Sequence, residues 1–237
     1  MPVAQTTTHA PRHYKRKRGE EAPDESTVTP GKVYVASMKM RGEWAPRPKD
    51  AVAVNVTSAQ GLRSRYRRDF SPMTEVPGLY NGYSCFENYW QSLKRYHGMP
   101  AKVEETVAKW WLRQGKGKRR CSHTNGYVVS HAQMDDISLG YVDSRKQCYV
   151  PKYEALCKDT ESAKECKQRR KVGVDQVFFD FDGPRDEQGG LACVEVTPDS
   201  LRAYINNTTH PFGHGWVVAA VVAGVDSSEY TSDAPIA

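Results

Sequence analysis

Three short runs of β-branched and aromatic residues constrain the fold of this chain most strongly. Residues 32–37 (KVYVAS) and 51–58 (AVAVNVTS) have the composition of strands. Residues 175–183 (DQVFFDFDG) have an apolar centre and end in a turn signal, which is typical of a buried strand. The sequence therefore predicts at least three strands, the last of them buried.

A helix is expected from Ser84, between the second and the third of these runs. Ser84 and Glu87 have the spacing of a capping box, with Ser84 as the N-cap. The helical pattern continues to about Tyr96 and stops near Gly98 and Pro100. We therefore predict a helix that carries Glu87 in its first turn.

Further helices are expected at residues 102–114, at 144–158, where Pro151 is a candidate break, and at 200–207. Residues 215–225 (GWVVAAVVAGV) are apolar throughout. Periodicity alone assigns this last segment to neither helix nor strand.

Composition divides the 237 residues into one folded region and two polar ends. Residues 1–31 cannot bury enough apolar surface to fold, so a disordered basic leader is expected there. Residues 32–225 suit a single domain, and residues 226–237 predict a flexible tail. The leader lacks the apolar core of a secretory signal, and no run approaches the ~18 apolar residues of a membrane span. We therefore expect an intracellular protein, cytoplasmic or nuclear, with no membrane partner.

Neither the cysteines nor the histidines predict a metal site. The six cysteines form no close pair, and without a signal peptide they are expected to be reduced thiols. The pair Cys121 and His123 does not match the ligand spacing of a closed zinc site. His210 and His214 have helical spacing, but the glycines beside His214 argue against a regular helix. We expect no metal and no cofactor.

The formal net charge is +6, and the cations gather in three runs. The run at residues 15–18 resembles a nuclear-targeting or nucleic-acid patch, and a solvated tail is the alternative. The runs at residues 63–70 (RSRYRRDF) and 113–120 (RQGKGKRR) indicate a phosphate-bearing partner or ligand. The candidate phosphate contacts are Lys15, Arg16, Lys17, Arg18, Arg67, Arg68, Arg119 and Arg120.

On a helical period, Glu87, Gln91 and Lys94 share one face. A polar stripe of this kind is most often a solvated helix face. Here the rings of Trp90 and Tyr96 are close in sequence, and an acid beside rings has a raised pKa because its charged form is desolvated. Such a carboxyl suits a general acid or base, or a group that stabilises a developing cation.

Residues 86–94 (FENYWQSLK) resemble the helix signature of the NADAR family, an acid followed by an aromatic pair, then Gln and Lys. Residues 67–73 (RRDFSPM), 177–190 and 210–222 are similar to further landmarks of that family, in the same order. Uncharacterised viral and phage proteins have a similar order of landmarks. The likeness extends over about residues 70–222.

The resemblance implies an α+β domain, mostly helical with a few short strands, that cleaves the N-glycosidic bond of ADP-ribose-type compounds. The implied partner is an ADP-ribose-like small molecule or an ADP-ribosylated nucleic acid. Glu87 would be the central acid, with Asp180 or Asp182 as the second acid. The implied ligand contacts are Phe70, Ser71, Trp90, Gln91, Lys94, His214 and Trp216.

Other interpretations start from the same residues. Asp180 and Asp182 after an apolar strand resemble the first motif of haloacid-dehalogenase-like phosphatases, but Pro184 replaces the usual Thr and too little chain follows. Asn88 stands where the NADAR helix usually has His. A non-catalytic nucleic-acid-binding or virion-associated protein that keeps the fold is the alternative function, with the basic runs as its contacts.

Overall fold

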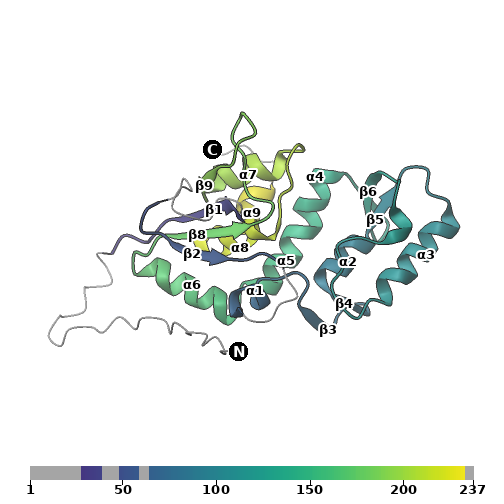
Figure 1. Cartoon of the computed structure of the whole chain (residues 1–237), viewed down its shortest axis with the longest axis horizontal. Coiled ribbons are helices and arrows are strands. Elements are labelled where there is room, and N and C mark those ends of the chain that lie inside the picture. The colour runs from purple at the N-terminus through teal and green to yellow at the C-terminus, as the bar shows by residue number, and fades with distance from the viewer. Residues whose placement is uncertain (1–27, 39–47, 59–63, 233–237) are drawn as a thin grey trace, which may run out of the picture.

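The computed structural model describes residues 28–38, 48–58 and 64–232. Residues 1–27 of the expected disordered leader, with its basic run, and residues 233–237 of the expected tail lie outside these ranges. Residues 28–31 of that leader are described, and the N–H of Gly31 donates to the carbonyl oxygen of Arg170 at 2.8 Å. Within them, helices and strands are mixed along the chain, so the fold is α+β. Figure 1 shows an elongated molecule, with one sheet and its helices at one end and α2, α3 and smaller strands at the other.

The main sheet has four strands in the order β2-β8-β1-β9. Strands β1 (Val33–Ser37), β2 (Val52–Asn55) and β8 (Gln176–Asp180) are parallel, and β9 (Cys193–Glu195) is antiparallel to β1. The register pairs Val35 and Val54 with Phe178. The three strands predicted from the apolar runs are confirmed, and every residue of β8 is buried.

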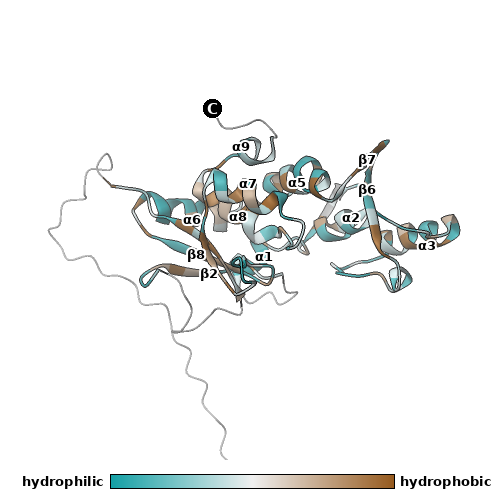
Figure 2. Cartoon of the chain, turned by 90° about the horizontal axis from the view of Figure 1, so that it is seen from above, coloured by the Kyte–Doolittle hydropathy of each residue, from teal (hydrophilic) through white to brown (hydrophobic). Residues whose placement is uncertain are grey.

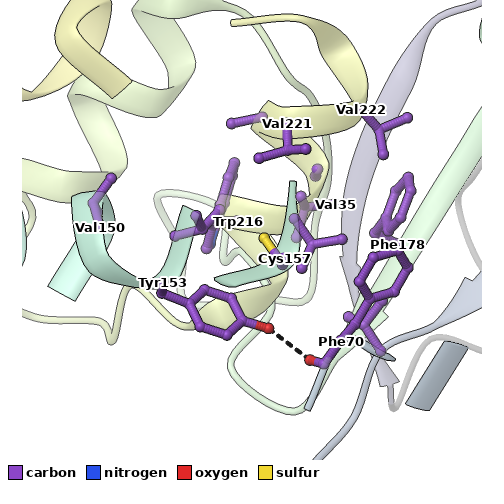
Figure 3. Packing of buried hydrophobic residues seen from close by; sticks show 14 of the residues in the cluster. Val35, Phe70, Val150, Tyr153, Cys157, Phe178, Trp216, Val221 and Val222 are labelled. Atoms are coloured by element: carbon purple, nitrogen blue, oxygen red, sulfur yellow. Dashed lines mark hydrogen bonds between the residues drawn. The ribbon is translucent and has the colours of Figure 1, made fainter. Parts of the chain in front are cut away.

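The apolar segment that periodicity left unassigned is the helix α8 (His214–Ala223). It packs on β1 and β8 of the sheet and against α5 and α6. Because protein surrounds it, all its residues up to Val222 are buried and it needs no polar face. Figure 3 shows the resulting core, in which the Tyr153 hydroxyl donates to the carbonyl oxygen of Phe70 at 2.7 Å.

The expected helix at residues 144–158 is a run of three segments. These are α4 (Tyr141–Ser144), the π-helical turn η3 (Arg145–Tyr149) and α5 (Val150–Cys157). Pro151 lies in the first turn of α5, where its missing N–H costs little. The irregular turn therefore precedes the proline, and the proline does not end the run.

The helix that carries Glu87 is shorter than predicted. Helix α2 spans Phe86–Ser92, and its N-cap is Cys85 with no side-chain cap bond. The capping-box prediction is wrong because the Ser84 hydroxyl accepts a bond from Asn88 Nδ2 at 2.9 Å. The chain then enters β5 (Lys94–Tyr96), which pairs with β6 (Val129–Met134). Lys94 is therefore a strand residue.

The remaining elements support these parts. They are α1 (Arg65–Asp69), β3 (Glu75–Tyr80), β4 (Tyr83–Cys85), α3 (Ala101–Leu112), η2 (Ser122–Thr124), β7 (Ile137–Leu139), α6 (Glu161–Lys171), α7 (Pro198–Asn206) and α9 (Ser227–Thr231). Helices α3 and α7 confirm two of the predicted helices. No helix in the described ranges is long and apolar enough to cross a membrane.

Three of these helices, α1, α6 and α9, lie where none was expected. Helix α6 is coloured hydrophilic along most of its length in Figure 2, and its buried residues are only Ser162, Ala163 and Cys166. Helix α9 begins after residue 226, inside the expected flexible tail. It packs against α5 and α7, and its Tyr230 is 1% exposed in the main core. The predicted tail boundary is therefore too early, since the fold continues into α9.

Candidate functional site

A cavity of about 560 Å³ lies beyond the carboxyl ends of the parallel strands. Ser58 follows β2, and residues 180–182 end and follow β8, so both strands deliver side chains to the same edge of the sheet. Helix α2 contributes Glu87, Trp90 and Gln91 to the lining. The cavity is thus formed where the sheet end of the molecule meets the α2 end.

Glu87 is half-buried at the wall of this cavity. Its backbone N–H donates to the carbonyl oxygen of Pro72 at 2.8 Å, and its Oε1 accepts a bond from Gln91 Nε2 at 2.7 Å. Burial raises the pKa of the Glu87 carboxyl, against the opposing effects of the Gln91 bond and of the charges on Lys94, His214 and Arg119. The carboxyl is therefore oriented, desolvated and surrounded by cationic groups.

Lys94 lines the same cavity from β5. Burial lowers the pKa of its ammonium group, and the charge of Glu87 opposes this effect. Within the described part of the chain, its side chain forms no hydrogen bond and no ion pair. A half-buried ammonium group with unused donors is suited to an anionic ligand.

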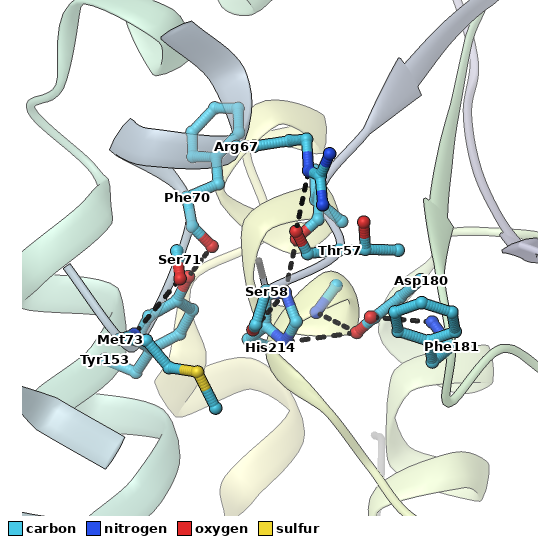
Figure 4. A network of polar contacts seen from close by, with 12 residues as sticks. Thr57, Ser58, Arg67, Phe70, Ser71, Met73, Tyr153, Asp180, Phe181 and His214 are labelled. Atoms are coloured by element: carbon cyan, nitrogen blue, oxygen red, sulfur yellow. Dashed lines mark hydrogen bonds and ion pairs between the residues drawn. The ribbon is translucent and has the colours of Figure 1, made fainter. Parts of the chain in front are cut away.

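Both carboxylate oxygens of Asp180 accept hydrogen bonds from the backbone (Figure 4). Its Oδ1 accepts from the backbone N–H of Phe181 at 2.7 Å, and its Oδ2 accepts from the N–H of Gly215 at 3.1 Å. The same Oδ2 lies 3.2 Å from Nδ1 of His214. A Cβ on Gly215 would lie 2.8 Å from the Cβ of Asp180, so this approach requires glycine. Asp180 fixes the start of α8 to the end of β8.

His214 completes this connection. Its Nε2 lies 2.5 Å from the carbonyl oxygen of Val56, which only accepts, so Nε2 carries the proton of that bond. The hydroxyl of Ser58 lies farther away, at 3.5 Å from Nε2. Both ring nitrogens of His214 have oxygen partners, so this buried side chain links β2, β8 and α8. His214 is at the cavity, as the resemblance implied, and it begins a helix despite the neighbouring glycines.

Asp182 differs from Asp180 because it has no hydrogen bond to another described residue. It is exposed at the mouth of the cavity. The surrounding protein and the charge of Asp180 raise the pKa of the Asp182 carboxyl, while His214 and Arg119 oppose the rise. Solvent access limits the size of this effect. Of the two acids that the sequence left open, Asp182 is the one available to a ligand.

One residue of the predicted basic runs in the described ranges reaches the cavity. Arg119 Nη2 donates to the carbonyl oxygen of Ser58 at 3.2 Å, and its guanidinium lies over the ring of Phe181. Arg120 is exposed elsewhere. On α1, Arg67 Nε donates to the carbonyl oxygen of Thr57 at 3.3 Å, and Arg68 lies 3.7 Å from the carboxylate of Asp69.

The loop that carries Arg119 is held by Asn88, the residue at which α2 departs from the NADAR pattern. Asn88 is fully buried. Its Oδ1 accepts from the N–H of Lys118 at 2.9 Å, and its Nδ2 donates to the carbonyl oxygen of Lys116 at 3.1 Å. The amide thus joins α2 to the loop after α3, which places Arg119 near Glu87.

Three of the implied ligand contacts are not at the cavity. Phe70 is 0% exposed and packs in the core near Phe178. The hydroxyl of Ser71 accepts from the N–H of Met73 at 3.1 Å. Trp216 is buried, and its ring stacks with those of Tyr204 and Phe212. These assignments are corrected, because the core takes up the apolar residues beside the motifs. Trp90, Gln91, Lys94 and His214 do line the cavity.

Sequence reasoning missed several lining residues. Arg145 and Tyr149 come from the π-helical turn η3, and Tyr141 and Phe181 lie at the mouth. Burial raises the pKa of the Tyr149 hydroxyl well above its ordinary value, and the charges of Glu87 and the two aspartates add to the rise. A π turn changes the periodicity of the side chains, so a helical pattern gives no signal for these residues.

No group of three or more His, Cys, Asp or Glu side chains within the described ranges is arranged to hold a metal ion. The chain matches no protein-family model, no curated protein and no solved structure. Evidence for the function therefore comes from the geometry of the cavity.

Proposed function

We propose that this protein is an N-glycosidase that hydrolyses the bond between a ribose and a base in an ADP-ribose-type compound. The observation that carries the proposal is the setting of Glu87. A carboxyl that is half-buried, fixed by Gln91 and raised in pKa by burial lies in a cavity with cationic groups. A solvated helix face could form the Gln91 bond, but its carboxyl would be neither half-buried nor raised in pKa by burial.

The reaction needs few groups. The bond between the anomeric carbon and the base nitrogen breaks, and its electron pair leaves with the base. The ribose then has oxocarbenium character, which the Glu87 carboxylate stabilises electrostatically. Water attacks the anomeric carbon and loses one proton. A base that leaves as an anion, such as guanine, takes up a proton in exchange, whereas nicotinamide leaves a cationic substrate as a neutral base and needs none. Asp182, whose carboxyl has no hydrogen bond to another described residue, is the proposed acceptor of the proton that the water loses.

The rest of the cavity suits the other parts of such a ligand. Cavities of about 300–1,000 Å³ hold small organic ligands, and this cavity falls within that range. The ammonium of Lys94 and the guanidinium of Arg119 are available for a pyrophosphate group. The rings of Trp90 and Tyr149 pack edge to face, with 5.1 Å between their centres, and give the cavity an apolar wall.

A single NADAR-like domain is part of the same proposal. Its support is that two landmarks of the resemblance, far apart in sequence, contribute to one cavity. Residues 86–94 supply Glu87, Gln91 and Lys94, and residues 177–190 supply the two aspartates. By contrast, the cations of α1 are used within the fold, where Arg65 pairs with Glu165 and Arg67 bonds to the backbone.

The test is to incubate the full chain with NAD-like substrates and with ADP-ribosylated guanine, and to measure released base or ADP-ribose. Calorimetry with the same compounds measures binding separately. Release from at least one substrate is expected. If nothing is released and nothing binds, the proposal fails. Binding to random oligonucleotides with a steep salt dependence would then favour the nucleic-acid-binding alternative.

A further inference from the structure

Two aromatic rings at the mouth of the cavity are unusually exposed. Tyr141 is 51% exposed and Phe181 is 52% exposed, and both line the cavity whose floor holds Glu87. The apolar side chains of Val128 and Val129 are also exposed along this rim. A rim that keeps this much apolar surface in water beside a polar floor is typical of a binding site.

Each ring is supported by an arginine. The guanidinium of Arg145 lies 3.9 Å from the centre of the Tyr141 ring, and that of Arg119 lies 5.5 Å from the centre of the Phe181 ring. Arg145 is itself 3% exposed and donates to the carbonyl oxygens of Ile205 and Asn207. Arg145 is therefore fixed by the fold before any ligand binds, and Arg119, which is exposed, is held by its bond to the carbonyl oxygen of Ser58 at 3.2 Å.

The backbone holds Phe181 in the same way. Its N–H donates to Oδ1 of Asp180, the residue that anchors α8. Asp180 and Phe181 lie side by side in Figure 4. Because this bond fixes the backbone of Phe181 and the Arg119 guanidinium lies over its ring, a ligand that stacks on the ring meets a reduced ordering cost.

We propose that Phe181 and Tyr141 form a base-stacking subsite at the mouth of the cavity. It would take a second nucleobase of the ligand, while the ribosyl bond that reacts lies at Glu87. Base stacking on aromatic side chains is worth about 1–3 kcal/mol per base and does not require hydrogen bonds to the base edge. This inference rests on the proposed function and adds the feature that selects the substrate. The subsite would favour a nucleotide with a base at each end and phosphates between them.

The experiment uses two probes that differ only by the base, AMP and ribose 5-phosphate. Binding of each to the full chain is measured by calorimetry. Wild type is expected to bind AMP more tightly. In Phe181→Leu, which keeps apolar bulk and removes the flat ring, AMP affinity is expected to fall about 5- to 150-fold, the change that corresponds to loss of one stacked base. Affinity for ribose 5-phosphate should not change.

Phe181→Tyr is the matched control, since it keeps a ring and should bind AMP as wild type does. Tyr141→Leu should weaken AMP binding, and Tyr141→Phe should weaken it less. Equal affinity of wild type for the two probes, or AMP affinity that is unchanged in both leucine variants, overturns the subsite. If AMP binds and responds to these variants while no N-glycosidic substrate is hydrolysed, the subsite stands and the proposed function fails.

Discussion

Gln91 donates a hydrogen bond of 2.7 Å from Nε2 to Oε1 of Glu87, one helical turn earlier on α2. This bond fixes the direction of a carboxyl that burial has partly deprived of water. The bond favours the charged form, while burial favours the neutral form, and burial has the larger effect on the pKa. The consequences of this balance are measurable.

The first prediction concerns stability and pH. Because the pKa of Glu87 is raised in the folded state, its contribution to stability is complete below the ordinary pKa of a glutamate. The contribution is lost as pH rises through the raised folded value. Glu87→Gln does not titrate, so its free energy of unfolding relative to that of wild type should increase, meaning a relatively more stable variant, as pH rises above about 4. Urea unfolding at several pH values measures this.

Glu187→Gln, a change at an exposed loop residue, is the control for that series. Its difference in stability from wild type measures the effect of the same substitution at a surface position. A Glu87→Gln difference that does not change with pH, or that moves in the opposite direction, would show that Glu87 is solvated as an ordinary surface acid.

The second prediction concerns Lys94. Lys94→Met keeps the length of the side chain and removes the ammonium. If the ammonium binds the pyrophosphate, the Kd for ADP-ribose should rise about 10- to 100-fold, as expected for loss of a charged hydrogen bond. Stability should not fall, since burial lowers the pKa of this group and so disfavours its charge. Lys102→Met on α3, which removes an exposed lysine, should change neither quantity.

The third prediction separates the core from the site. Trp216 stacks with Tyr204 at 4.5 Å between ring centres and does not line the cavity. Trp216→Ala should therefore destabilise the fold by about 3–5 kcal/mol. Trp216→Phe should keep the stack and leave ligand affinity unchanged. A large affinity loss in Trp216→Phe at normal stability would return this residue to the binding site.

The fourth prediction concerns Asn88 and the loop that it holds. Asn88→Ala leaves the N–H of Lys118 without its buried acceptor, which should cost about 1–3 kcal/mol. It should also weaken ADP-ribose binding, because Arg119 follows directly in the chain. Asn88→Asp keeps the acceptor for the Lys118 N–H and loses the donor to the carbonyl oxygen of Lys116, so it tests the acceptor alone. Hydrogen exchange of the Lys118 amide should therefore be slow in the wild type and in Asn88→Asp, and fast in Asn88→Ala; equal exchange in all three would contradict this role.

The local part of the site was predictable from the sequence. The i, i+4 spacing of Glu87 and Gln91 needs only one helical turn, and the structure gives them that turn. Asp180, which ends the strand at residues 176–180, and Asp182, which follows it, lie at the sheet edge because buried parallel strands end there. In each case the sequence signal and the structure involve neighbouring residues.

The rest depended on contacts between distant parts of the chain. The helix ends before Lys94 because the chain begins to pair with β6 there. The N–H of Gln133, a residue of β6, donates to the carbonyl oxygen of Leu93 at 2.8 Å. Arg145 reaches the cavity through a π turn that no helical period predicts. Trp216 was assigned to the ligand by resemblance, but Tyr204 and Phe212 hold it in the core. A local sequence pattern does not predict pairing and packing of this kind.

The most direct test of the account is the turnover of Glu87→Gln. The variant keeps the size of the side chain and an oxygen that can accept the Gln91 bond, so it should fold as wild type does. If the carboxylate stabilises an oxocarbenium-like transition state, single-turnover release of base from an ADP-ribose-type substrate should fall at least ~10²-fold, while substrate affinity changes little. Release at the wild-type rate by Glu87→Gln would contradict the central role of Glu87.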